Sequence, residues 1–191
     1  MSTLVIVLRI VSLLVFAGPM LLLGAGRCGR PKTRAHQSGS DRAPLVANLA
    51  TVGVYLPSLL VFPGSTAGST ALLLASSGSL LAVAGAALVL GSRAELGQAW
   101  SFAPKADQGT GLVTTGPYRL VRHPIYLGFA LLAMGEALAF GSWPALVIVL
   151  SGIVPTFAWR ARVEEKLLSR TFGERYAAYR QRTKMIIPYL L

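Results

Sequence analysis

The chain has 191 residues, of which 53% are hydrophobic and only 13% are charged, and its mean hydropathy is +0.60. Soluble domains usually carry about 25% charged residues, so this composition excludes an ordinary soluble protein. The net charge of +11 then indicates anionic lipid headgroups as the partner in preference to nucleic acid. Cys28 is the single cysteine, which excludes an internal disulfide, and the His and Cys residues lack metal-site spacing.

Apolar segments of roughly the 20 residues that cross a bilayer recur along the chain. They predict an all-α integral membrane protein with about five transmembrane helices, at residues 3–24, 44–62, 70–91, 125–141 and 143–159. We interpret the first segment as a retained span, because it begins without Lys or Arg and is long for a signal peptide. The third is rich in Gly, Ala and Ser, which allow close helix approach in lipid. Gly141, Ser142 and Pro144 favour a tight reversal between the last two.

Basic residues segregate between the loops. The loops at 25–43 and 92–124 and the tail after residue 159 contain all of them except Arg9, whereas the loop at 63–69 and the turn near 141 contain none. Cytoplasmic loops carry the excess of Lys and Arg, so five spans place the N-terminus outside and the C-terminus in the cytoplasm. Arg9 lies early enough in the first span to extend its side chain to the outer interface.

The tail after Arg160 is predicted to form an amphipathic helix on the cytoplasmic side. Its apolar side carries Leu168, Phe172, Tyr176 and Tyr179, and another side carries Arg162, Lys166 and Arg170. A basic amphipathic helix next to a span lies in the headgroup plane. Gly173 is expected to interrupt it.

Residues 116–128 form the most chemically dense stretch, with two arginines, a histidine and two tyrosines at the start of the fourth span. Pro124 suits the first turn of a helix, where a missing N–H costs nothing. His123 then precedes the helix at the interface, where free backbone N–H groups attract a carboxylate or phosphate. The alternative is an interfacial anchor, with His123 as a simple helix cap.

Arg160 and Glu164 are four residues apart and share a helix face. The hairpin of the last two spans places them near His123 and Tyr126, and together these residue types can bind a zwitterionic ligand. The alternative is a surface salt bridge worth about 0–1 kcal/mol. Glu165 and Arg162 are expected to be the solvent-facing neighbours, and the register between Glu164 and Glu165 stays open.

Glu136 lies inside the fourth predicted span. An acidic residue at membrane depth is a functional candidate that pairs or faces a cavity. It could gate a lipid-facing tunnel, carry protons, or be protonated and hydrogen-bonded to a neighbouring helix.

The second half of the chain, from about residue 90 to 191, resembles the isoprenylcysteine carboxyl methyltransferase and phospholipid methyltransferase superfamily. The matching motifs are Leu96–Ser101, Gly111–Arg119, Arg122–Gly128, Glu164–Leu168, Phe172–Tyr176 and Tyr179. This resemblance implies a scaffold at residues 1–91 and a methyltransferase core at residues 92–191.

The resemblance further implies an integral membrane methyltransferase that uses S-adenosylmethionine, with the cofactor in a cytoplasmic pocket formed by the last two spans and the tail. It assigns Arg160 to the methyl acceptor. The cofactor would be bound by Leu112, Val113, Tyr118, His123, Pro124, Tyr126 and Glu164. A lipophilic acceptor would enter from the bilayer, as a prenylcysteine-type carboxylate, an isoprenoid acid or a lipid amine. Arg160 favours a carboxylate, because arginine binds carboxylates well.

Two other functions remain open from the sequence. One is a membrane reductase of related architecture that binds NADPH, with tail arginines available for the 2′-phosphate. The other is a small transporter or assembly factor that uses Glu136 as its proton-linked residue, in which case Glu136 would be essential.

Overall fold

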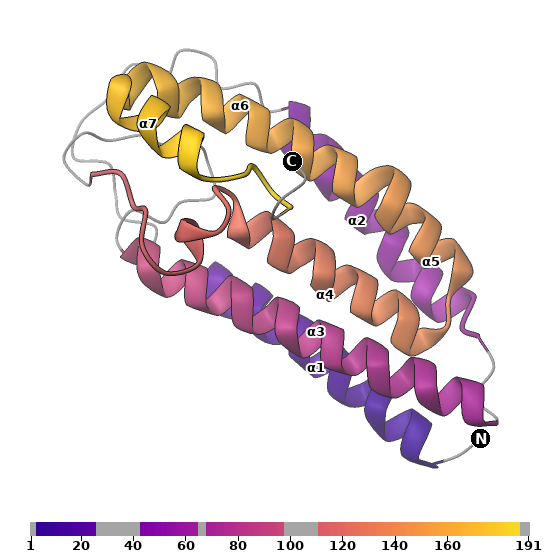
Figure 1. The fold of residues 1–191 in the computed structure, drawn as a ribbon. Coiled ribbons are helices and arrows are strands. Elements are labelled where there is room, and N and C mark those ends of the chain that lie inside the picture. The colour runs from indigo at the N-terminus through magenta and orange to yellow at the C-terminus, as the bar shows by residue number, and fades with distance from the viewer. Residues whose placement is uncertain (1–2, 26–42, 65–67, 98–110, 188–191) are drawn as a thin grey trace.

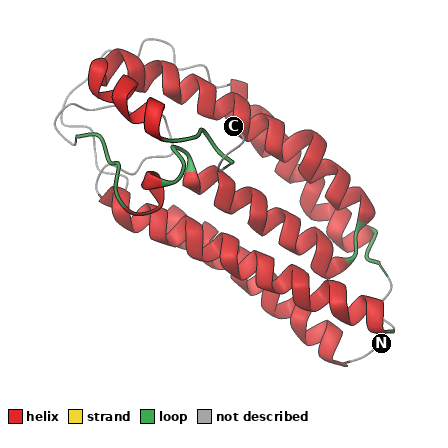
Figure 2. Ribbon diagram, viewed as in Figure 1, coloured by secondary structure: helices red, strands yellow, loops and turns green. Residues whose placement is uncertain are grey.

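The computed structural model describes residues 3–25, 43–64, 68–97 and 111–187. Within these ranges all regular elements are helical (Figure 2), and one isolated parallel bridge joins Val121 and Lys184. Most of the basic loop expected at 25–43, and the motif residues 98–101, lie outside the described residues.

The long helices run side by side (Figure 1). α1 and α3 pack together along one edge, α4 lies in the middle, and α2 packs with α5 and α6 along the other edge. In chain order the helices are α1 (Thr3–Ala25), α2 (Ala43–Val61), α3 (Ser69–Leu96), η2 (Gly116–Arg119), α4 (Pro124–Phe140), α5 (Trp143–Ile148), η3 (Val149–Ile153), α6 (Val154–Phe172) and α7 (Glu174–Arg182).

Three helices in the described part are long and apolar enough to cross a membrane, namely α2, α3 and the continuous Trp143–Phe172 helix formed by α5, η3 and α6. The Thr3–Pro19 part of α1 and all of α4 are shorter apolar helices. Leucines on the outside of the bundle, such as Leu14, Leu60 and Leu73, are each 67% exposed, as expected for side chains that face lipid. The predicted all-α integral membrane fold is therefore confirmed.

α3 and α4 approach closely because glycines alternate across their contact. A Cβ atom added to Gly85 would lie 2.6 Å from the Gly128 carbonyl oxygen, and one added to Gly135 would lie 2.5 Å from the Ala82 nitrogen. Without side chains at these positions the two backbones come together, which is how small residues drive helix association in lipid. The small residues of the third predicted span thus serve the packing role expected of them.

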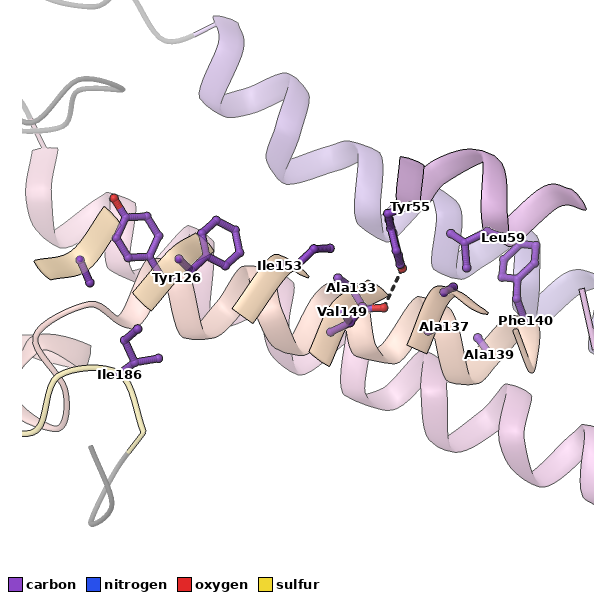
Figure 3. Close-up of a cluster of buried hydrophobic side chains, with 13 residues drawn as sticks. Tyr55, Leu59, Tyr126, Ala133, Ala137, Ala139, Phe140, Val149, Ile153 and Ile186 are labelled. Carbon is purple, nitrogen blue, oxygen red and sulfur yellow. Dashed lines mark hydrogen bonds between the residues drawn. The ribbon is translucent and has the colours of Figure 1, made fainter. Parts of the chain in front are cut away.

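A buried apolar cluster runs along the inner side of α4 (Figure 3). It contacts α2 through Tyr55 and Leu59, and it contacts the Trp143–Phe172 helix through Val149, Ile153 and others. The Tyr55 hydroxyl donates a hydrogen bond of 2.7 Å to the Ala133 carbonyl oxygen, so its polar end is satisfied inside the bundle. Tyr126 and Ile186 lie at the opposite end of this cluster from Leu59.

One turn of the Trp143–Phe172 helix is wound as a π-helix, at Val149–Ile153. Pro155 lies two residues after this turn. Proline has no N–H and its ring crowds the carbonyl of the residue four positions earlier, so the backbone widens locally instead of breaking. The helix then continues to Phe172, where Gly173, with φ of 52°, separates it from α7 as the sequence predicted.

The predicted reversal between α4 and α5 is confirmed. Gly141 adopts the left-handed conformation, and the Ser142 side chain accepts a hydrogen bond of 3.4 Å from the Ala145 backbone N–H at the start of α5. Both residues are typical of such helix ends.

Arg9 lies among backbone carbonyl groups at the end of α4 that is farther from His123. It is only 8% exposed, and its guanidinium donates to the carbonyl oxygens of Ala139 at 3.0 Å and Phe140 at 2.9 Å. These carbonyls end α4 and lack helical N–H partners, and they form the negative end of the helix dipole. Arg9 therefore caps a neighbouring helix instead of reaching toward water.

Candidate active site

The candidate site lies where α4 begins and where η2, the later part of α6, α7 and the segment after α7 come together (Figure 1). Charged and aromatic side chains from positions about 40 residues apart in the sequence meet there. The cluster surrounds His123, which is only 6% exposed.

The chain segment before α4 is shaped by local sequence. Gly116 has a φ of 57°, and a Cβ atom at this position would lie 2.6 Å from the Glu95 carboxylate. The same carboxylate accepts a hydrogen bond of 2.8 Å from the Thr115 hydroxyl. Pro117 then starts the short η2 helix, and Pro124 starts α4. His123 occupies the N-cap position of α4, but its imidazole makes no capping hydrogen bond, which leaves the ring available to α6.

Glu164 joins the two halves of the site. Its carboxylate accepts a short hydrogen bond from the Tyr126 hydroxyl. It also lies 3.6 Å from Nδ1 of His123 and 3.5 Å from Nε of Arg160. The predicted pair of Arg160 and Glu164 is thus formed. It faces α4, as expected for adjacent helices in a hairpin.

Glu165 differs from its expected solvent-facing position. It is 8% exposed, and its carboxylate lies 2.6 Å from Nε of Arg122 and 3.6 Å from Nε2 of His123. Arg180 of α7 approaches the same carboxylate at 3.9 Å. A buried carboxylate needs such partners, and Arg122, which is 43 residues away along the chain, provides the closest. Arg162 is exposed, as predicted.

Aromatic rings form an apolar wall beside the charges. The His123 and Tyr126 rings stack with centroids 5.5 Å apart, and Tyr126 stacks on Phe157 at 5.2 Å. The Arg160 guanidinium carbon lies 5.7 Å from the centroid of the Tyr126 ring, within the range of a cation–π interaction. Tyr126 is therefore held on one side by imidazole, on another by phenyl, and at its hydroxyl by Glu164.

The electrostatics of the site favour a proton on His123. Burial by itself disfavours the imidazolium, but the hydrogen-bonding capacity and negative charge of Glu164 and Glu165 outweigh it and raise the pKa of His123 above its ordinary value. The Nε2 atom is buried and has no hydrogen-bond partner among the described residues. The carboxylates on both sides thus favour the protonated form of the imidazole.

The α7 helix packs against η2, which precedes α4. The Tyr179 hydroxyl donates a hydrogen bond of 2.7 Å to the Tyr118 carbonyl oxygen. Burial raises the pKa of Tyr179 to about 12 and the pKa of Tyr118 as well, so both phenols stay protonated at neutral pH. The predicted apolar side of the tail thereby faces the protein, where Tyr176 is also buried.

The remaining predicted site residues are Tyr118, Pro124, Leu112 and Val113. Pro124 and Tyr118 are buried. Leu112 and Val113 lie on the loop that leads to η2 and are half-buried. No contact described for them joins them to the charged cluster, so their roles stay predictions.

Glu136 lies elsewhere, ten residues along α4 from Tyr126, which is about 15 Å at the rise of an α-helix. It is fully buried, and the Ser12 hydroxyl lies 3.2 Å from its Oε2 atom. The contact with α1 matches one of the open interpretations, a hydrogen bond to a neighbouring helix.

The sequence did not predict several contacts of the site. These are the ion pair of Arg122 and Glu165, the stacking of Phe157 on Tyr126, and the hydrogen bond from Arg122 to Thr183. Consecutive carboxylates at 164 and 165 were one usable signal. Neighbouring side chains on a helix point about 100° apart, so Arg160 cannot pair with both Glu164 and Glu165. The second carboxylate therefore needs a second cation.

The comparisons with known proteins concern the same part of the chain. The family model described as phospholipid methyltransferase matches residues 73–175. The protein-S-isoprenylcysteine O-methyltransferase of Schizosaccharomyces pombe is 33% identical over 98 residues, which is 50% of this chain and 42% of that protein. The Saccharomyces cerevisiae protein of the same name is 37% identical over 86 residues, covering 45% and 36% respectively.

One more curated relative and one solved structure are also similar to this chain. Methanethiol S-methyltransferase 1 of Bradyrhizobium diazoefficiens is 33% identical over 76 residues, 38% of this chain and 24% of that protein. A solved structure of the eukaryotic intramembrane Ras methyltransferase, isoprenylcysteine carboxyl methyltransferase, is similar with a TM-score of 0.57 at 19% identity, over 78% of this chain and 53% of that chain. This likeness shows the shared fold.

The chain thus matches less than half the length of these curated relatives. The family model, in contrast, covers more than half of the chain and includes every residue of the charged cluster around His123 except those of the last helical turns. The protein belongs to the phospholipid methyltransferase family.

Proposed function

We propose that this protein is a membrane methyltransferase that transfers a methyl group from S-adenosylmethionine to a lipophilic acceptor. The observation that carries the proposal is the meeting of Arg160 and Glu164 with His123 and Tyr126 at one end of an apolar helix bundle. Family membership supports the same activity. It also favours this activity over a reductase or a transporter, which no observation on the described residues supports specifically.

The residues present fit the proposed cofactor. S-adenosylmethionine carries a carboxylate, an ammonium group, a sulfonium and ribose hydroxyls, so it needs both anionic and cationic partners. Glu164 would accept from the ammonium group or the ribose, and the buried Nε2 of His123, which has no hydrogen-bond partner in the described structure, would donate to an acceptor. The ring of Tyr126 offers an aromatic face to a cation. Tyr118, Pro124, Leu112 and Val113 would complete the surroundings.

When bound, S-adenosylmethionine supplies a methyl group that is already activated by the positive sulfur, so the protein needs little acid–base chemistry. The contribution of the chain is alignment of the acceptor and exclusion of water. Arg160 is held in place by Glu164 at 3.5 Å and by the Tyr126 ring, and it would orient the acceptor. Tyr126 and Phe157 form a stacked apolar wall, which would keep water away from the reacting atoms.

We propose an anionic acceptor, such as a prenylcysteine-type or isoprenoid carboxylate, over a lipid amine. The charged cluster contains Arg122, Arg160, Arg180 and a histidine that favours its charged form, against Glu164 and Glu165. This balance is positive, which attracts an anion and repels a protonated amine. The names of the two yeast relatives indicate O-methylation for those proteins, and the apolar outer faces of the bundle let a lipophilic acceptor approach from the bilayer.

The proposed topology has five spans, formed by α1, α2, α3, α4 and the last long helix, with the N-terminus outside. The site and α7 then lie on the cytoplasmic side, with the basic residues of α6 and α7 near the headgroups. Residues 1–91 would act as the scaffold and residues 92–191 as the methyltransferase core.

Titration of S-adenosylhomocysteine, the product of the cofactor, into the detergent-purified protein tests the proposal by calorimetry. We expect one-to-one binding that an excess of S-adenosylmethionine prevents and that NADPH leaves unchanged. Absence of binding to either sulfur compound would refute the proposed function. Glu164→Gln, which keeps the shape but removes the charge, should weaken binding by about tenfold or more, whereas Glu174→Gln on exposed α7 should not.

A further inference from the structure

In the proposed function Arg122 contributes only to the positive charge of the cluster, yet its side chain contacts two separate elements. Its Nε atom lies 2.6 Å from Oε1 of Glu165, and the side chains are only 8% and 11% exposed. Removing one member of a buried ion pair leaves the other charge uncompensated. The pair therefore couples the corner before α4 firmly to α6.

The same guanidinium reaches the end of α7. Its Nη1 atom donates a short hydrogen bond to the Thr183 carbonyl oxygen and one of 3.3 Å to the Arg180 carbonyl oxygen. The last carbonyls of a helix lack N–H partners and form the negative end of its dipole. Arg122 thus caps α7 while it pairs with Glu165.

The backbone on either side of Arg122 repeats this attachment. The backbone N–H of Arg122 donates to the Lys184 carbonyl oxygen at 2.8 Å, and that of His123 donates to the Met185 carbonyl oxygen at 3.0 Å. Residues 183–187, which we name the strap, therefore run along the corner. Ile186 of the strap is buried in the same apolar cluster as Tyr126 (Figure 3).

We propose that Arg122 and Glu165 are positioning residues, which hold the strap against the corner and fix the imidazole of His123 for ligand binding. Oε1 of Glu165 is shared between Nε of Arg122 and Nε2 of His123, so the pair determines where one side of the ring faces a negative charge. This inference rests on the proposed function, because it assigns the pair to the same cofactor site.

A simple structural salt bridge would stabilise the strap without affecting how His123 takes part in ligand binding. The groups that face His123 and its carboxylates are Glu164, Glu165 and Arg160 of α6, Tyr126 of α4, and Tyr176 and Arg180 of α7, besides Arg122 itself. Among these, Glu164 and Glu165 are the groups that raise the pKa of His123. Loss of the charge of Glu165 should therefore lower that pKa. The pH dependence of ligand binding should shift with it only if His123 takes part in binding, which a purely structural role does not predict.

The first measurement needs no ligand. Hydrogen exchange of the Arg122 and His123 backbone amides, read by mass spectrometry, reports whether the strap remains attached. We expect Glu165→Gln and Arg122→Gln to accelerate this exchange by about tenfold or more. Arg162→Gln, a matched loss of an exposed charge on α6, should leave the rate unchanged.

The second measurement is the pH dependence of S-adenosylhomocysteine binding. In Glu165→Gln we expect the midpoint of the pH profile to move to lower pH, because His123 loses one of the carboxylates that favour its charged form. Arg162→Gln should keep the profile of the unmodified protein. If Glu165→Gln does not fold, both measurements are made on Arg122→Lys. This variant keeps the positive charge, but the shorter side chain cannot reach Glu165 and Thr183 together.

The outcomes separate the two proposals. If the unmodified protein binds no S-adenosylhomocysteine, the proposed function fails while the exchange rates still test attachment of the strap. If it binds and neither exchange nor pH profile changes in the variants, the role of Arg122 and Glu165 is overturned while the methyltransferase function stands. Faster exchange with an unchanged pH profile also overturns the positioning role and leaves a structural salt bridge.

Discussion

Arg160 and Arg162 are two positions apart on one helix, but their side chains have different surroundings. Arg160 lies beside Glu164 and over the Tyr126 ring, whereas Arg162 is exposed. We expect Arg160→Ala to lower kcat/KM for methyl transfer by at least about thirtyfold, roughly 2 kcal/mol, because an anionic acceptor loses its cationic partner. Steady-state kinetics with a prenylcysteine analogue measures this.

Arg162→Ala is the control for that experiment and should retain full turnover. Equal activity of both variants would contradict an acceptor-binding role for Arg160. Binding of S-adenosylhomocysteine should change less than kcat/KM, since the cofactor is assigned chiefly to other residues.

His123 makes the stability of the folded protein depend on pH. The folded-state pKa of His123 is raised, while the unfolded-state value is about 6.5. Its ion pairs therefore contribute fully below that pH, and their contribution is lost as the pH rises through the folded-state pKa. We expect the melting temperature in detergent to fall as the pH rises above about 6.5.

The same decrease should be smaller in His123→Gln, which has no titrating ring at this position. Thermal unfolding across the pH range, followed by circular dichroism, measures both proteins. A decrease of equal size in the variant would show that other groups cause the pH dependence.

Among the helices, the contact between α3 and α4 depends on missing side chains. A Cβ atom at Gly85 would meet the Gly128 oxygen at 2.6 Å, while one at Gly91, in the same helix, would meet nothing within 4 Å. We expect Gly85→Ala to lower the free energy of unfolding by about 1–3 kcal/mol, because the two backbones must separate.

Gly91→Ala is the matched control. It should be neutral or stabilise the protein by up to about 1 kcal/mol, since alanine favours the helix over glycine. Thermal unfolding in detergent compares the two variants. The prediction fails if both alanines have the same effect.

At the scale of the whole molecule, the distribution of basic residues predicts the orientation in the membrane. Cys28 is the single cysteine and belongs to the basic segment between the first two helices. With the N-terminus outside, this segment is cytoplasmic. A membrane-impermeant maleimide should therefore label Cys28 only after the cells are permeabilised.

The comparison variant combines Cys28→Ser with Thr66→Cys, because Thr66 belongs to the segment between the second and third helices, which carries no basic residue. This variant should be labelled in intact cells. The reverse pattern of labelling would invert the proposed topology and place the site outside.

The sequence by itself determined the helices, the reversal at Gly141, the interruption at Gly173 and the pair of Arg160 with Glu164. These features are local, because hydropathy, turn residues and four-residue spacing act within one helix or one turn. The sequence also predicted that the His123 stretch and the Arg160–Glu164 pair lie close together, because a hairpin of adjacent helices brings its ends together.

Only the tertiary structure decided the direction of side chains whose partners lie far away in sequence. Glu165 is buried because Arg122 approaches from another helix end, and Arg9 faces inward because the last carbonyls of α4 need donors. A helix position has no orientation of its own until neighbours pack around it. The ion pair across 43 residues and the Arg9 hydrogen bond across 130 residues thus follow from packing, which no local pattern encodes.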